Sequence, residues 1–131
     1  HMNLLEDHGL VRLVDQVIKR VLRKISSEEV NLTKRAAELA RLYGLRTPSS
    51  VEWSSRQMKR WGSCTPVDGT IRLSNRLASM PGWVIDSVLV HELAHLEVAD
   101  HGPRFQEKVD RYEFTERARG YLLAKSEQSF D

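Results

Sequence analysis

The sequence predicts a single domain of the α+β class, and three observations predict it. Apolar residues recur at helical spacing towards both ends of the 131-residue chain, short strand-like segments alternate with turn residues in its middle, and one helix is apolar on nearly every side. Apolar residues make up 40% of the chain and charged residues 29%, which is compatible with a packed core. We expect one domain over 3–131, with N-terminal helices in 3–46, a three-stranded sheet in 51–75 and a helical part in 81–125.

Two helices are predicted before the sheet. In residues 10–25 apolar side chains recur every three or four positions, which is typical of a helix with one buried face. A second helix runs to about Tyr43, and Gly44 is the expected stop because glycine readily takes the left-handed conformation that ends many helices. The apolar positions of the first helix are Leu10, Leu13, Val14, Val17, Ile18, Val21, Leu22 and Ile25.

Three short strands are predicted in the middle of the chain. Val51–Ser55 alternates apolar and polar residues, and Met58–Thr65 is strand-like although Gly62 weakens it. The turn residues 66–69 then lead into a third strand that begins at Thr70. Because the connections are short, we expect an antiparallel meander.

The next helix is predicted to be central and buried. Residues 82–98 leave almost no polar face, so this helix should be covered on most sides. His101-Gly102-Pro103 breaks it, and Pro103 suits the first turn of a following helix. That last helix carries three apolar residues at helical spacing: Phe105, Val109 and Tyr112.

The buried helix contains the pattern H-E-x-x-H. His91 and His95 are four residues apart, so their rings lie one above the other and can reach one metal ion. Glu92 is adjacent, where it can accept a proton from a metal-bound water without being a ligand. Two histidines inside an apolar helix also need polar partners, which a metal ion provides. We therefore predict a zinc site.

A catalytic zinc site needs a third protein ligand, and His101 is the favoured candidate. In a continuous helix His101 would lie ~9 Å beyond His95 along the axis, but the break at His101-Gly102-Pro103 allows the chain to turn back. Three histidines and a water form an open zinc site. Carboxylates on the last helix are the competing ligands: Glu107, Glu113 and Glu116.

Charge, cysteine content and hydropathy restrict the class of protein. Residues 1–60 contain 12 Lys and Arg against 7 Asp and Glu. A solvated helix face is the favoured explanation of this basic excess, and a nucleic-acid-binding surface is the open alternative. Cys64 is the single cysteine, so no internal disulfide forms, and a reducing compartment fits. No apolar run reaches the ~20 residues of a membrane span. We expect a cytoplasmic monomer without membrane contact.

Several blocks of the sequence together resemble the YgjP-like small zinc metallopeptidases, relatives of the SprT-like and minigluzincin groups. The blocks are Arg60-Trp61-Gly62-Ser63-Cys64, Ile71-Arg72-Leu73-Ser74-Asn75, Val90-His91-Glu92-Leu93-Ala94-His95-Leu96 and His101-Gly102-Pro103-Arg104-Phe105. The resemblance implies a peptidase in which His91, His95 and His101 bind zinc and Glu92 is the general base. The cysteine ribbon that some SprT-like proteins use near DNA is absent.

Three further residues are candidates for supporting roles. Arg60 and Tyr112 could stabilise a developing oxyanion, although an ion pair for Arg60 and core packing for Tyr112 are the simpler interpretations. Asp86 lies just over one turn before His91 and could orient it, or could simply be solvated. The alternative function is a noncatalytic, zinc-stabilised binding module that could act on nucleic acid.

The substrate is expected to be a peptide or protein segment in extended form. Such a segment can add to an exposed sheet edge through main-chain hydrogen bonds. We expect Thr70–Asn75 to be that edge because it directly precedes the metal helix. The other two strands, Val51–Ser55 and Met58–Thr65, are the alternatives.

Overall fold

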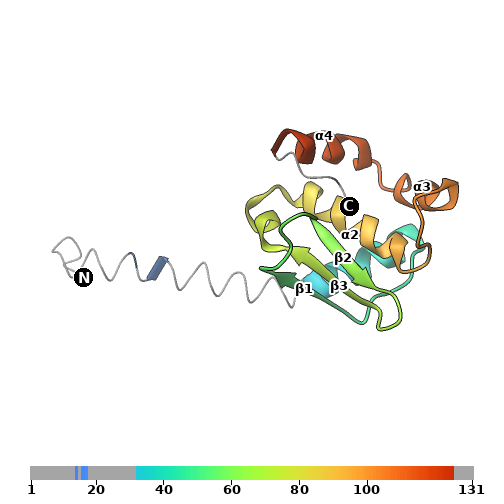
Figure 1. The fold of residues 1–131 in the computed structure, drawn as a ribbon, viewed down its shortest axis with the longest axis horizontal. Coiled ribbons are helices and arrows are strands. Elements are labelled where there is room, and N and C mark those ends of the chain that lie inside the picture. The colour runs from blue at the N-terminus through green and yellow to red at the C-terminus, as the bar shows by residue number, and fades with distance from the viewer. Residues whose placement is uncertain (1–13, 15, 18–31, 126–131) are drawn as a thin grey trace. The chain divides into compact units, whose positions relative to one another are not determined.

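The structure is a computed structural model that describes residues 14, 16, 17 and 32–125 (Figure 1). The chain divides into two compact units, His1–Val30 and Asn31–Asp131, and the H-E-x-x-H pattern lies in the second. Of the first predicted helix only residues 14, 16 and 17 are described, and they are helical. The rest of that helix lies outside the described residues.

The described elements form an α+β fold, as the sequence predicts. A helical segment at 32–43 precedes the sheet, and helices follow it. No helix within the described residues is long and apolar enough to cross a membrane. The elements in order are β1 (Ser50–Ser54), β2 (Gly62–Thr65), β3 (Thr70–Ser74), the 3₁₀ helix η1 (Asn75–Ser79), α2 (Gly82–His95), α3 (Pro103–Val109) and α4 (Thr115–Lys125).

The sheet is mixed, so the predicted antiparallel meander is wrong. The strand order is β1-β3-β2, with β3 parallel to β1 and antiparallel to β2. Ile71 and Leu73 of β3 are fully buried, as suits the central strand of a covered sheet. The prediction that Thr70–Asn75 is the substrate edge is therefore also wrong, because β3 is paired on both sides. In the described sheet β1 and β2 are the edge strands.

A tight hairpin joins β2 to β3, as the turn residues predict. Gly69 has a φ of 71°, and its N–H donates to the Thr65 carbonyl oxygen at 2.9 Å. Its backbone also lies against Ser49, where a Cβ at position 69 would meet the Ser49 hydroxyl oxygen at 2.8 Å. Positive φ and this close approach both require glycine here.

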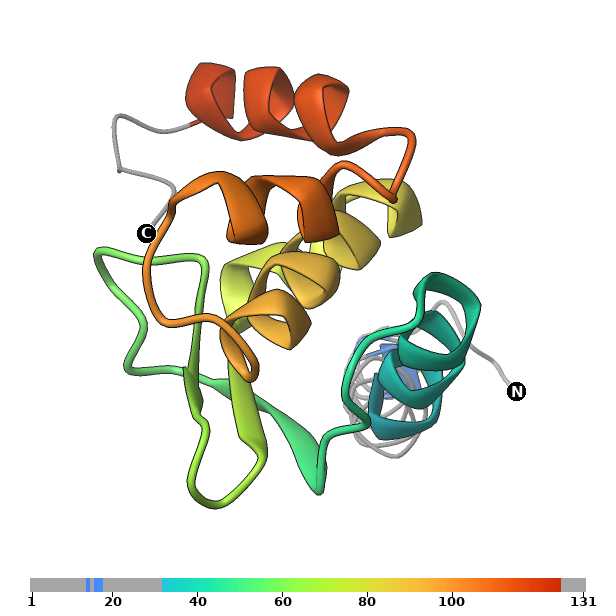
Figure 2. The same ribbon diagram turned by 90° about the vertical axis from the view of Figure 1, so that its right-hand side faces the viewer.

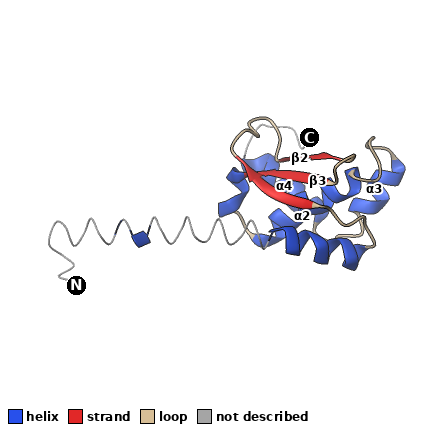
Figure 3. Cartoon of the chain, turned by 90° about the horizontal axis from the view of Figure 1, so that it is seen from below, coloured by secondary structure: helices blue, strands red, loops and turns tan. Residues whose placement is uncertain are grey.

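The helix α2 is the centre of the packing. It lies against β2 and β3, and α3 and α4 pack on it (Figures 2 and 3). It ends at His95, three residues before the predicted end. The chain then tightens into a turn in which the Leu96 N–H donates to the Leu93 carbonyl oxygen at 3.2 Å and the Glu97 N–H donates to the Ala94 carbonyl oxygen at 3.1 Å. The chain therefore begins to turn back before His101.

Two helices follow α2 where the sequence predicts one. The first, α3, ends at Val109, so Tyr112 lies in the turn before α4 rather than on a helix face. Tyr112 is nevertheless buried, and its ring meets Tyr43 edge to face with the centroids 5.8 Å apart. The apolar spacing of this segment therefore predicts its burial correctly but not its helix boundary.

The helical segment at 32–43 is attached to the sheet and to α2 by polar contacts. The Thr33 hydroxyl bonds both backbone groups of Val51, at 3.1 and 3.2 Å. Arg35 makes two hydrogen bonds to the Asp86 carboxylate, at 2.6 and 3.0 Å. The segment ends at Gly44, which has a φ of 67°, as predicted.

Replacing Gly69 by alanine should destabilise the fold by about 1–3 kcal/mol, because the new Cβ is strained by the positive φ and collides with Ser49. Gly120 is the matched control. It lies within α4, and a Cβ added there would meet no atom within 4 Å. Gly120→Ala should therefore raise the free energy of unfolding by about 0.5–1 kcal/mol. Urea unfolding of the two variants measures both changes. Equal stabilities would contradict the assigned turn geometry.

Candidate metal centre

The helix α2 presents two histidines and a glutamate from its last two turns. His91 and His95 are 6% and 9% exposed, and Glu92 is 2% exposed. Most of the neighbouring positions on α2 are also buried, so the three polar side chains are held inside the fold rather than in solvent. Burial of this kind is costly unless the polar groups have partners.

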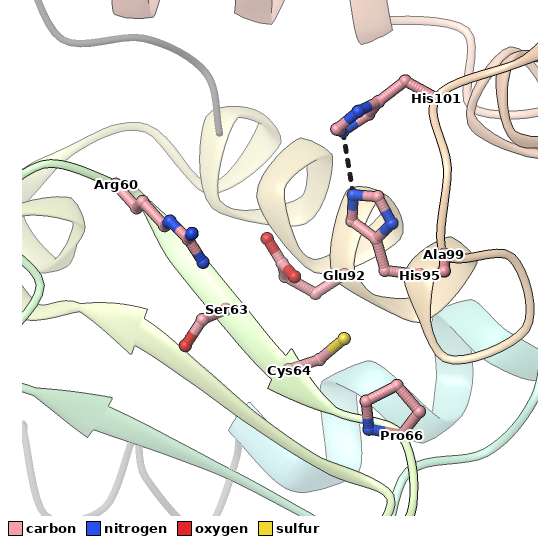
Figure 4. A pocket seen from close by; sticks show the side chains of 8 residues that line it. All are labelled: Arg60, Ser63, Cys64, Pro66, Glu92, His95, Ala99 and His101. Carbon is pink, nitrogen blue, oxygen red and sulfur yellow. Dashed lines mark hydrogen bonds between the residues drawn. The ribbon is translucent and has the colours of Figure 1, made fainter.

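His101 completes a cluster of three imidazoles. One ring nitrogen from each of His91, His95 and His101 lies within 4.8 Å of the others. The Nε2 atoms of His95 and His101 are 3.0 Å apart (Figure 4). Two nitrogens bound to one tetrahedral zinc ion would be about 3.3 Å apart, so this pair already has nearly the spacing of two metal ligands.

The segment between α2 and α3 returns His101 to the helix. The Gly102 N–H donates to the Asp100 carboxylate at 2.8 Å, and Pro103 begins α3 immediately afterwards. A Cβ at position 102 would lie 2.8 Å from the same carboxylate oxygen, so glycine leaves room for this turn. The turn fixes the direction from which His101 approaches the cluster.

The ring of His95 is oriented by the backbone. Its Nδ1 lies 3.0 Å from the Val98 carbonyl oxygen, which can only accept, so Nδ1 is the protonated nitrogen. Nε2 then carries the lone pair and faces the cluster. A hydrogen bond donated by the other ring nitrogen is the usual means by which proteins orient a metal-binding histidine.

Phe105 forms an apolar wall beside the three histidines. Its ring stacks on His95 with the centroids 4.3 Å apart and meets the edges of His91 and His101, each at 4.9 Å. It comes from α3, four residues after His101, and is 2% exposed. Phe105 therefore limits how far the imidazoles can rotate and keeps water from that side.

A cavity of about 240 Å³ opens beside the cluster (Figure 4). The helix α2 and the segment after it form one wall, and β2 with the residues on either side of it forms the other. Glu92 and Arg60 approach it from these opposite sides. The residues lining it are Arg60, Ser63, Cys64, Pro66, Glu92, His95, Ala99 and His101.

The candidate carboxylate ligands on the C-terminal part are not among the clustered groups. Glu107 instead accepts two hydrogen bonds from Arg111, both at 2.8 Å, and these bonds lower the pKa of its carboxyl group. Among the described residues that could ligate a metal, Glu113 and Glu116 also lie outside the cluster. The structure thus brings His101, and none of these three glutamates, to His91 and His95.

Of the three supporting candidates, the structure brings Arg60 to the cavity and not Tyr112 or Asp86. The Tyr112 hydroxyl donates to the Trp83 carbonyl oxygen at 2.8 Å, and burial raises its pKa to about 12, with the Asp86 charge adding to the shift. The Asp86 carboxylate accepts hydrogen bonds from Arg35 instead. Arg60 is exposed and lines the cavity.

Sequence reasoning missed part of the cavity wall. Ser63 and Cys64 follow Arg60 closely in the chain, so the strand prediction could have placed them beside it once β2 was known to be an edge. A lone cysteine favours a small buried residue, but Cys64 is partly exposed and lines the cavity. No sequence pattern predicts that Ala99 lines the cavity, because only the turn after α2 places it at the cavity wall.

Comparisons with known proteins identify a solved structure of similar fold and the family of the chain. A crystal structure of the metallopeptidase zymogen abylysin from Pyrococcus abyssi is similar with a TM-score of 0.64 and 21% sequence identity, over 79% of this chain and 99% of the other. At that identity the likeness shows a shared fold. No curated protein matches the sequence. The model of the YgjP-like metallopeptidase domain matches residues 4–119, so the chain belongs to the YgjP-like metallopeptidase family.

Proposed function

We propose that the chain is a zinc-dependent peptidase in which Glu92 is the general base. The observation that carries this proposal is the convergence of three imidazoles beside a buried carboxylate, with His95, His101 and Glu92 lining one open cavity. Membership of a metallopeptidase family supports peptide hydrolysis. A site with a purely structural metal would have no need of Glu92 at the cavity.

Zinc fits the residues that are present. Three neutral imidazoles with a fourth position open to a cavity form a donor set typical of catalytic zinc. The Nδ1–H of His95 donates to the Val98 carbonyl oxygen, which leaves Nε2 turned towards Nε2 of His101, 3.0 Å away. His91, His95 and His101 would hold the ion, and bound zinc would supply a Lewis acid that acidifies water and polarises a carbonyl group.

The residues of the chain then perform the proton transfers. The Glu92 carboxylate accepts a proton from the attacking water and passes it to the departing amine nitrogen. Its burial at the wall of the cavity keeps it next to the reacting atoms and shields it from bulk water. Arg60, on the opposite wall, is the candidate to stabilise the negative oxygen that develops on the substrate.

The edge strand β2 is the proposed substrate platform. It lines the cavity through Ser63 and Cys64 and lies at an edge of the described sheet. Because the Ser74 N–H donates to the Trp61 carbonyl oxygen at 2.8 Å, the backbone groups of Gly62 face away from β3 by the alternation of an antiparallel pair. An extended peptide would add along this side.

Purified protein should contain about one zinc ion per chain and lose thermal stability on chelation, because a metal bound only by the folded state stabilises it. Zinc at a concentration of 100 times its Kd would raise the free energy of unfolding by about 2.7 kcal/mol. For a domain of this size that corresponds to a rise of about 10 °C in Tm. Elemental analysis and thermal unfolding measure both. Protein that neither retains nor takes up zinc would contradict the proposal.

Glu92→Gln should keep its zinc and lose about 10²–10⁴-fold in turnover, because the amide cannot accept the proton. Cleavage of a peptide library by the wild type and the variant measures the loss, and zinc content is the control. If the wild type binds zinc but cleaves no peptide, the chain is a noncatalytic zinc module instead.

His101→Ala should weaken zinc binding itself, because two protein ligands remain on an ion that prefers four. Glu107→Ala, Glu113→Ala and Glu116→Ala are matched controls that should titrate with zinc like the wild type. Wild-type zinc affinity in His101→Ala, together with a loss of affinity in one of the glutamate variants, would move the third ligand to α3, to the turn after it or to α4.

Peptide addition to β2 predicts a periodic effect of backbone methylation. In zinc-loaded Glu92→Gln protein, N-methylation of a bound peptide should weaken binding at every second residue, since only alternate N–H groups of an added strand face the sheet. Fluorescence titration of an N-methyl series reads this out. Losses without a two-residue period would contradict strand addition.

A further inference from the structure

A second cavity adjoins the metal cavity at the loop between β1 and β2. Its volume is about 380 Å³, and it shares Arg60 and Ser63 with the metal cavity, so the two cavities are neighbours. The loop supplies almost all of its lining. The lining residues are Arg56, Gln57, Met58, Lys59, Arg60 and Ser63.

This second cavity is strongly cationic. Arg56, Lys59 and Arg60 are all exposed, and none of them forms an ion pair with a described residue. Among the described residues lining either cavity, Glu92 is the sole carboxylate, and it is 2% exposed on the far wall of the metal cavity. Within the described part of the chain, the surface beside the metal centre therefore offers three cations that form no ion pair.

The cationic loop is held in place by Arg76. One Arg76 nitrogen donates to the carbonyl oxygens of Gln57 and Arg60, at 2.9 and 2.8 Å, and the guanidinium lies 4.2 Å from the ring centroid of Trp61. The Gln57 side chain also donates to the Ser63 hydroxyl at 2.9 Å, which ties the loop to β2. A binding surface fixed in advance loses less entropy when a ligand binds.

We propose that this second cavity binds an aspartate or glutamate side chain of the peptide substrate. Arginine and lysine both bind carboxylates by charge-assisted hydrogen bonds, and Met58 offers an exposed apolar contact for the stem of the same side chain. This inference rests on the proposed peptidase function and names the class of peptide that the site selects.

The direction of β2 places the acidic residue after the scissile bond. The cationic loop immediately precedes β2, so it lies at the strand's N-terminal end. Antiparallel addition is the slightly more stable arrangement, and it sets the C-terminal half of the peptide against that end. The selected carboxylate is therefore one of the first residues on the C-terminal side of the bond that is cut.

The test uses zinc-loaded full-length Glu92→Gln protein and fluorescein-labelled peptide pools. Each pool fixes either glutamate or glutamine at one position relative to the cleavage site. Glutamate pools should bind about 10-fold more tightly at the positions just after that site, and the difference should shrink in high salt. At positions before the site the two pools should bind alike.

Substitution of the loop cations should remove the preference. Arg56→Gln with Lys59→Gln should bring the glutamate pools to the affinity of the glutamine pools, and Lys59→Gln alone should lose about 2–5-fold. Lys34→Gln with Arg41→Gln removes the same charge from two exposed positions on the helix at 32–43 and should leave the preference unchanged. Circular dichroism checks that each variant is folded.

Three outcomes of the binding experiments would overturn the inference. The first is equal affinity for glutamate and glutamine pools, and the second is an equal loss in the loop and control variants. The third is tighter binding of a single-stranded oligonucleotide that displaces the peptide, which would assign the cations to nucleic acid. If neutral and acidic peptides are cleaved equally well, the peptidase function stands and the acidic preference alone fails. If the wild type cleaves no peptide, both fail.

Discussion

The arrangement depends on placing two imidazoles and a carboxylate inside a helix that is buried on most sides. His91, Glu92 and His95 are each less than 10% exposed, and polar groups at that depth are costly unless they are partnered. Helical spacing puts both histidines on one face, so one small cation could serve both. The early end of α2, the Asp100–Gly102 turn and the Phe105 wall all bring a third imidazole to the same place.

The sheet positions the opposite wall. With β3 in the centre, β2 is left at the edge beside α2, and the loop before it reaches the cavity mouth. Arg76 holds that loop through two backbone carbonyls, and burial lowers the pKa of its guanidinium because the charged form loses solvent there. The guanidinium stays charged nonetheless, since arginine titrates far above neutral pH. The proposed general base on α2 and the proposed peptide-binding strand β2 thus face each other across one cavity.

Much of the fold and part of the site could be predicted from local patterns. The spacing of His91 and His95, the stop at Gly44 and the turn before β3 are all encoded within a few residues. The parallel pairing of β1 with β3 was not predictable in the same way, because strands of four or five residues carry no information about which neighbour they choose. Because the strand order could not be predicted, β3 was wrongly expected to be the sheet edge that binds substrate.

Long-range contacts explain the remaining differences. Tyr112 has the right chemistry to stabilise an oxyanion, but packing against Tyr43 and a hydrogen bond to Trp83 place its hydroxyl elsewhere. Asp86 has the right spacing to orient His91, but Arg35, 51 residues earlier, takes its carboxylate. Helical spacing shows which residues share a face, whereas the partner of a charged group depends on which distant segment packs there.

Whether His91, His95 and His101 together form one metal site is tested most directly by X-ray absorption spectroscopy of the zinc-loaded chain. The spectrum counts the ligand atoms around the ion and identifies their elements. We expect three imidazole nitrogens and one oxygen at about 2.0–2.1 Å, with one imidazole fewer in His101→Ala. A sulfur ligand at about 2.3 Å from Cys64, or a spectrum unchanged by His101→Ala, would contradict the three-histidine site.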